Sequence, residues 1–204
     1  MITADLNTIF AFLILIIFLV FIMAIIGYVF FVIFRYRGRE ERSVDSVYLQ
    51  VSVPRLNEIK IDAMEQLFAS LFSIKKGGFK QKFAVQPTIS FEIVARSEDI
   101  KFFVWTPTEY KDLIERQIHG AYPDAEIKEV QEINLFSEEG KVAYKSLQLS
   151  KANYYPLKTF KDLPTDILAS LTSSLAKLGE EEGACVQILI SPAESDWQDH
   201  GKHH

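Results

Sequence analysis

The sequence predicts an α+β fold that follows a single membrane-spanning helix, and three observations lead to this prediction. Residues 9–34 form an uncharged apolar run near the amino terminus. Behind it, short stretches that alternate apolar and polar residues are interleaved with stretches whose apolar residues recur three and four positions apart. These two periods are typical of strands and of amphipathic helices, respectively. Gly, Pro, Asp and Asn residues separate the stretches, as expected for turns.

The apolar run has the length of a transmembrane helix. It reads IFAFLILIIFLVFIMAIIGYVFFVIF. As a helix it would extend roughly 39 Å, enough to cross a hydrocarbon core of about 30 Å with some tilt. It has no polar face, so it does not match a helix that lies on the membrane surface. It also lacks the basic start and the small-residue cleavage site of a signal peptide. We expect a retained anchor at 9–34, preceded by a short extracytoplasmic segment at 1–8.

The charges that flank the anchor predict its orientation. Only Asp5 and the amino terminus precede it, whereas residues 35–45 form a basic juxtamembrane linker. Basic residues next to a transmembrane helix stay in the cytoplasm. We therefore expect a single-pass protein of the plasma (inner) membrane, with its N-terminus outside and the bulk of the chain in the cytoplasm. The expected membrane-interface residues are Arg35, Arg37, Arg39 and Arg42.

The composition limits the function of the cytoplasmic part. The 204-residue chain has a formal net charge of −5, and the linker contributes more basic than acidic residues. The remainder is thus more acidic still, which argues against direct nucleic acid binding, because that function needs a basic surface. The single Cys185 cannot form an internal disulfide and fits a reducing compartment. Its apolar neighbours indicate a packed strand rather than a nucleophile.

Residues 46–133 are predicted to form the first unit. The alternation from Val47 to Val53 indicates a strand, which Pro54 ends. A helical period follows from Asn57 to Ile74, with Asn57 as a candidate N-cap. Two further strands are expected at 89–95 and 100–105, joined by a short turn.

The second half of this unit begins at a predicted helix cap. Thr106 can cap the helix, Pro107 suits its first position, and Glu109 can complete a capping box. Gly120 is expected to end this helix. Residues 125–133 then read as a charged edge strand. The order strand, helix, strand, strand, helix, strand is that of a ferredoxin-like βαββαβ unit.

Residues 134–193 are predicted to form a second, incomplete βαβ unit. A strand is expected at about 142–150, a helix from Pro164 to Gly179, and a last strand at 184–190. Ser191-Pro192-Ala193-Glu194 repeats the cap chemistry of Thr106-Pro107-Thr108-Glu109 and predicts another helix, which leaves 194–204 as a truncated helix or a tail. We interpret the chain as the front portion of a longer architecture or as a shortened paralogue, with a frayed tail as the alternative.

Motifs for catalysis and for cofactor or metal binding are absent from the sequence. There is no G-x-x-x-x-G-K-[ST] phosphate loop, G-x-S-x-G elbow, H-E-x-x-H pair or cysteine pair. We therefore expect a protein that is not an enzyme, with no cofactor, and we interpret His200, His203 and His204 as part of a tail. One basic loop could face anionic lipid or a partner, or could simply be solvated. Its residues are Lys75, Lys76, Lys80 and Lys82.

Several blocks of the chain resemble one protein family. The blocks are the anchor, EIKIDAMEQLFASL, SFEIVARSEDIKFFVWTP, YKDLIERQIHGAYPDAEI, YYPLKTFKDLPTDILASL and GACVQILISPA. They are similar to the membrane-anchored front region of type IV secretion and conjugative DNA-transfer ATPases of the FtsK/HerA superfamily, up to about Ala193. The motor domain of these ATPases, with its phosphate loop, has no counterpart here. The resemblance therefore implies membrane tethering and contacts with subunits or partners, and no catalytic residue is carried over.

These observations lead to one preferred function and two alternatives. The preferred function is a non-catalytic, membrane-anchored assembly or docking module of a secretion or DNA-transfer apparatus. Its expected partners are membrane lipid and an ATPase or other apparatus subunits, and self-association stays open. The first alternative is a freestanding membrane-tethered binding module for a protein or a small ligand. The second is an acylphosphatase-like enzyme that uses Arg55 and Asn57 in the first strand-to-helix loop.

Overall fold

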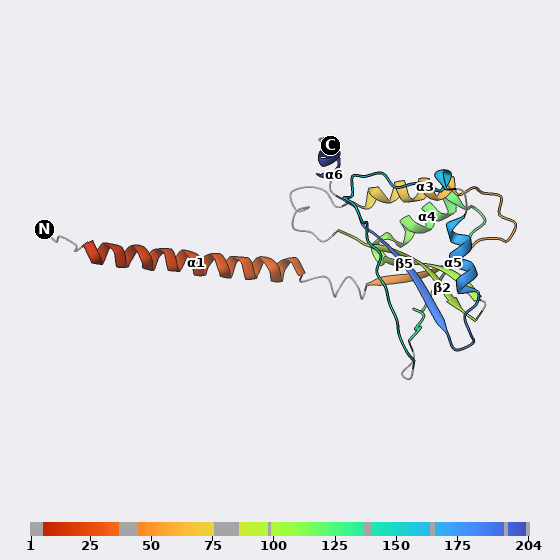
Figure 1. The fold of residues 1–204 in the computed structure, drawn as a ribbon, viewed down its shortest axis with the longest axis horizontal. Coiled ribbons are helices and arrows are strands. Elements are labelled where there is room, and N and C mark those ends of the chain that lie inside the picture. The colour runs from red at the N-terminus through yellow and green to blue at the C-terminus, as the bar shows by residue number, and fades with distance from the viewer. Residues whose placement is uncertain are drawn as a thin grey trace. The chain divides into compact units, whose positions relative to one another are not determined.

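The chain folds into two separate units, which are described in turn. The computed structural model describes residues 6–36, 45–75, 86–97, 99–136, 140–163, 166–193 and 196–202 (Figure 1). The N-terminal helix α1 belongs to one unit, and residues 45–76 and 86–204 form the other. We call this second unit the head.

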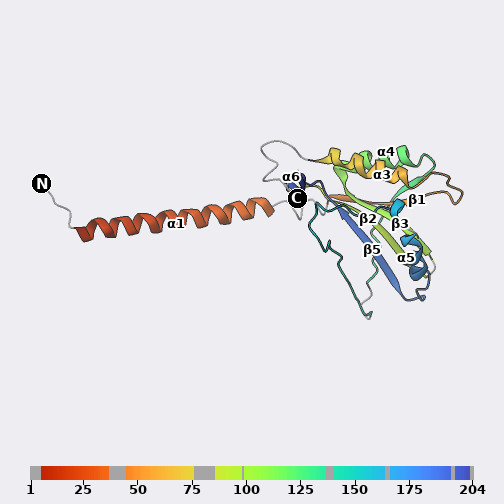
Figure 2. The same ribbon diagram turned by 45° about the horizontal axis from the view of Figure 1, so that its top comes forward.

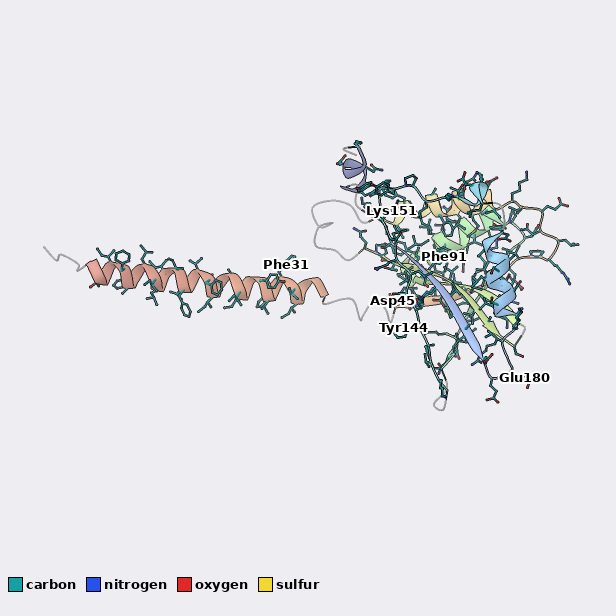
Figure 3. All side chains as sticks on the ribbon, viewed as in Figure 1. Phe31, Asp45, Phe91, Tyr144, Lys151 and Glu180 are labelled. Atoms are coloured by element: carbon teal, nitrogen blue, oxygen red, sulfur yellow. The ribbon has the colours of Figure 1, made fainter. Side chains whose placement is uncertain are left out.

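The first unit contains the predicted apolar helix. Helix α1 spans Leu6–Tyr36, and its stretch Thr8–Ile33 has a mean hydropathy of 3.5. None of that stretch is buried against the rest of the protein, and its side chains project on all sides of the helix (Figure 3). By length and composition this helix can cross a membrane.

The head is built on one antiparallel sheet of five strands (Figure 2). The order across the sheet is β4-β1-β3-β2-β5, and each neighbouring pair is antiparallel. The predicted α+β class is therefore confirmed. The last strand joins the same sheet as the first four instead of starting a second one. The strands are β1 Ser46–Ser52, β2 Ile89–Arg96, β3 Asp99–Pro107, β4 Glu126–Val130 and β5 Gly183–Ile190.

Two helices cover one face of this sheet in both views (Figures 1 and 2). Helix α3, Asp62–Ser70, continues into the 3-10 turn η1, Leu71–Ile74. Helix α4, Lys111–Ala121, follows the 3-10 turn η3, Thr108–Tyr110. Because side chains alternate across a strand, every second strand residue points to these helices. The main core consists of Leu49, Leu67, Leu71, Ile74, Ile89, Val104, Ile114, Ile118 and Ala125.

The opposite face carries a second, smaller cluster. Tyr48, Val94 and Phe103 are buried there and pack against Trp105, Val130, Ile133 and Leu135. The chain after β4 thus crosses this face, and the Arg96 guanidinium donates a hydrogen bond of 3.0 Å to the Asn134 carbonyl. A Cβ on Gly183 would lie 3.0 Å from the Leu135 side chain, so a larger residue here would require that side chain to shift by a few tenths of an ångström.

Two of the predicted helix starts, at Asn57 and at Thr106, were wrong. The Asn57 side-chain oxygen accepts a hydrogen bond of 3.1 Å from the Ile59 amide in a local turn, and α3 begins only at Asp62. Thr106 is fully buried in β3, where it pairs with Val47, and no side chain caps α4. Extended pairing with β1 holds Thr106 and Pro107 in the sheet, so the capping box cannot form.

The strand predicted at 142–150 was also wrong. Residues 140–149, which include Tyr144 (labelled in Figure 3), pair with no strand in the described part of the chain. The side chains of Tyr144 and Leu147 are 95% and 92% exposed. The spacing of the apolar residues explains why no strand forms. Val142 and Tyr144 are at even positions, whereas Leu147 and Leu149 are at odd positions. A regular strand would put these two pairs on opposite faces.

The other C-terminal predictions hold better. Helix α5, Ile167–Leu175, lies within the predicted helix, although the predicted start at Pro164 lies outside the described residues. It begins after Asp166, whose carboxyl group accepts a hydrogen bond of 2.9 Å from the Leu168 amide. Ahead of it, η4 spans Phe160–Asp162. Helix α6, Asp196–Lys202, confirms the helix predicted after Ser191-Pro192.

Candidate functional site

A hydrogen-bonded carboxyl group lies on the sheet face opposite α3 and α4. Glu92 projects there from the middle of β2 and accepts three hydrogen bonds. The Tyr48 hydroxyl donates at 2.8 Å, the Ser90 hydroxyl at 2.8 Å and the Gln187 amide at 2.8 Å. Because the donors come from β1, β2 and β5, the side chain of one residue connects three strands. We call Tyr48, Ser90, Glu92 and Gln187 the Glu92 network.

The position of Tyr48 depends on an aromatic contact. Strand β3 separates β1 from β2, and the Tyr48 ring stacks on Phe103 of β3 with a centroid distance of 4.7 Å and an interplanar angle of 6°. This stacking directs the hydroxyl group across β3 to Glu92. Burial raises the pKa of Tyr48 well above its ordinary value, and the hydrogen bond to Glu92 raises it further. Tyr48 therefore stays protonated and donates at neutral pH.

Burial and Glu92 also act on the pKa of Cys185. It lies on β5 directly opposite Val94 of β2, two residues before Gln187. Burial raises the pKa of its thiol, and the charge of Glu92 adds to the effect. A thiol with a raised pKa is a poor nucleophile. With three donors on the Glu92 carboxyl group, the network links β1, β2 and β5 and so stabilises the sheet.

A shallow apolar groove lies at the other face, between η1 and the end of β5. It has a volume of about 170 Å³. Lys75 follows η1 directly, and its ammonium group lies 5.4 Å from the centre of the Phe72 ring. Sites for drug-sized ligands and cofactors usually measure about 300–1,000 Å³, so this groove is smaller than such sites. Its lining residues are Phe68, Leu71, Phe72, Ile74, Ile190, Ser191, Pro192 and Ala193.

The predicted basic residues fall largely outside the described part of the chain. Of the loop Lys75, Lys76, Lys80 and Lys82, only Lys75 lies within it. Arg35 is the last residue but one of α1, and its side chain is not among those described. Arg37, Arg39 and Arg42 lie outside the described residues, as do His203 and His204. The expected membrane interface therefore stays a prediction, because the described part of the chain does not include these arginine side chains.

The loop proposed for acylphosphatase-like chemistry is described in full. Arg55 and Asn57 are both exposed, and the Asn57 side-chain oxygen is used in its own turn. Among the described residues, no three His, Cys, Asp or Glu side chains gather as metal ligands would.

Sequence reasoning missed both the Glu92 network and the groove. The sequence did contain a signal for the network. Ser90 and Glu92 are two positions apart and so lie on the same face of a strand whose other residues are mostly apolar. A charged residue in the middle of such a strand needs partners, as the cost of burying a carboxylate is high. The groove had no such signal, since its lining comes from segments more than a hundred residues apart.

Comparisons with known proteins give one match. A family model described as "Domain of unknown function (DUF8128)" matches residues 39–204, which include all of the head. No curated protein and no solved structure matches the chain.

Proposed function

The chain belongs to the DUF8128 family, a domain of unknown function, and we propose that it is a membrane-anchored docking module of a type IV secretion or conjugative DNA-transfer apparatus. In this proposal α1 spans the plasma (inner) membrane, and the head binds a secretion or DNA-transfer ATPase or another apparatus subunit in the cytoplasm. The chain itself is not an enzyme. Its similarity to the front region of such ATPases supports the choice of apparatus.

One observation carries the docking role, namely the apolar groove beside η1. Protein interfaces are dominated by a few apolar or aromatic side chains that fill small pockets on the partner. A groove of about 170 Å³ with the exposed Phe72 at its rim has the size for such a contact. Lys75, next to Phe72, adds a positive charge at this rim and favours an acidic residue on the partner.

The fold of the head supports a binding role as well. We infer that β1 to β4, with α3 and α4, form a ferredoxin-like unit to which β5 is added. The chain order strand, helix, strand, strand, helix, strand supports this inference. The helices cover part of one face of the sheet, and the chain after β4 packs on part of the other. Loops, edges, the groove and the uncovered parts of both faces near β5 remain as contact surfaces.

A photo-crosslinking experiment tests the docking role. A photoreactive amino acid is placed at Phe72 in the full-length chain, and a matched variant carries it at the exposed Leu56, in the loop before α3. We expect crosslinks in cells from position 72, and not from 56, to an ATPase or another apparatus subunit. Crosslinks only to proteins outside such an apparatus would favour the freestanding binding module. Equal patterns at the two positions would contradict docking in the groove.

The membrane topology has its own test, because Cys185 is the only cysteine and is exposed on β5. A membrane-impermeant maleimide should label Cys185 in inside-out vesicles and should fail to label it in intact cells. The basic linker supports this orientation, since arginines next to a transmembrane helix remain in the cytoplasm. Labelling in intact cells would reverse the proposed topology, and extraction of the protein without detergent would reject the anchor.

A further inference from the structure

The two edges of the sheet differ in how well they are protected from pairing with another chain. Strand β4 forms one edge and reads EIKEV, so three of its residues are charged. Its Lys128 forms an ion pair of 2.8 Å with Glu126, and Glu129 pairs with Lys111 of α4. Charged side chains on an edge strand oppose the approach of a further strand. The β4 edge is therefore protected.

Strand β5 forms the other edge and has no such protection. It reads GACVQILI, eight residues without a charge, and β2 is its sole partner among the described residues. Ile188 and Leu189 point to opposite faces of the sheet and are 56% and 63% exposed. A long, uncharged edge strand with exposed apolar side chains is a site for adding another strand.

We propose that β5 of one copy pairs antiparallel with β5 of a second copy, which extends the sheet across a two-fold axis. Pairing centred on Gln187 sets Val186 opposite Ile188 of the second copy and Cys185 opposite its Leu189. No two like charges meet in this arrangement. By contrast, self-pairing of β4 centred on Lys128 would set two lysines opposite each other, and directly opposed like charges destabilise a sheet.

The symmetry of this pairing is consistent with the two faces of the sheet. A two-fold axis perpendicular to the sheet keeps the helix-covered faces of both copies on the same side. In that arrangement Val186 and Ile188, which face the side of the sheet covered by α3 and α4, lie next to residues of the second copy that face the same side. The same surface is used by both copies, as in most closed dimers. This inference is based on the exposed edge of β5 and does not depend on which partner protein binds the head.

Disulfide crosslinking of the full-length chain in liposomes tests the pairing. Three variants carry a single cysteine in a Cys185→Ser background, namely Val186→Cys, Gln187→Cys and Ile188→Cys. Each position is the centre of one pairing register, where opposed Cα atoms lie within the range that a disulfide bridges. We expect one of the three to form, under oxidation, roughly tenfold more interchain disulfide than Lys128→Cys on the β4 edge. If none exceeds this control, the proposal is overturned.

Two further variants separate this pairing from its alternatives. Adding Ile188→Lys to a crosslinking Val186→Cys or Gln187→Cys variant should reduce the interchain product several-fold, because it places a charge in the apolar seam between the two edge strands. The chain's own segment 140–149 is another potential occupant of the edge. An intrachain disulfide between Gln187→Cys and Tyr144→Cys, formed in place of the interchain product, would show that this segment covers β5 and would overturn the proposal.

Discussion

The hydroxyl group of Tyr48 on β1 lies 2.8 Å from the carboxyl group of Glu92 on β2, although β3 runs between these two strands. The ring spans the intervening strand by stacking on Phe103. Gln187 of β5 donates to the same carboxyl group, so a single glutamate connects the first, second and last strands of the chain. Three of the following predictions depend on this arrangement.

Tyr48→Phe should lower the free energy of unfolding by about 1.5–3 kcal/mol, the usual range for a hydrogen bond to a charged group. The substitution keeps the stacking on Phe103 and removes only the donor. Urea unfolding of the full-length chain in detergent micelles, followed by the fluorescence of Trp105 and Trp197, measures the change. Tyr144→Phe is the control and should have no effect, because Tyr144 is almost fully exposed. Equal midpoints for the two variants would contradict the role of Tyr48.

The stability conferred by Tyr48 should disappear at high pH. Burial, followed by the hydrogen bond to Glu92, raises the pKa of Tyr48 in the folded state above the value of about 10 in the unfolded chain. The folded state therefore holds the phenolic proton more tightly, and its contribution is complete below pH of about 10 and is lost as the pH rises above it. The difference in unfolding free energy between wild type and Tyr48→Phe should shrink above this pH. A difference that stays constant would refute the expected shift.

Cys185 is accessible to solvent on β5, but its partly buried thiol should alkylate more slowly in the folded protein than in the unfolded chain. Burial first, and the charge of Glu92 second, raise the pKa of its thiol, so less thiolate is present at pH 8 than in the unfolded chain. Glu92→Gln removes the smaller of these two causes and should speed the reaction with iodoacetamide without reaching the rate of the urea-unfolded chain. A rate in the variant equal to that of wild type would show that the charge of Glu92 does not act on Cys185.

Asp166→Ala should destabilise α5, because it removes the side chain that accepts the hydrogen bond from the Leu168 amide. Loss of an N-cap typically costs about 1 kcal/mol, which corresponds to roughly fivefold faster amide hydrogen exchange in the helix. Thr106→Val is the matched variant at the position where the sequence predicted a cap. It should leave exchange in α4 unchanged, because Thr106 lies in β3. Faster exchange in α4 would restore the predicted capping role of Thr106.

The order of elements was largely predictable from the sequence, because each depends on a local pattern. The apolar run became α1, and the alternating stretches became strands β1 to β5. The helix start at Thr106 failed because a cap competes with strand pairing, and pairing involves residues far away in the chain. Thr106 has a good capping pattern, but its partner Val47 in β1 keeps it in the sheet.

The candidate sites were less predictable, since they depend on strand order. Glu92 and Gln187 meet only because β5 pairs with β2, and no local pattern specifies that pairing. At 142–150 the opposite happened, because a local pattern predicted a strand that did not form. Its residues favour an extended chain, but the change of parity between Tyr144 and Leu147 leaves no single face to bury.

The hydrogen bond between Glu92 and Gln187 joins residues 95 positions apart. During synthesis at about 5–20 residues per second, Glu92 therefore emerges on the order of 5 to 20 s before its last donor. Throughout that interval the outer edge of β2 lacks its neighbour, and the nascent sheet is open to wrong partners. Any factor that slows translation between these two positions lengthens this exposure, so the protein's yield should depend on elongation rate as well as on its final stability.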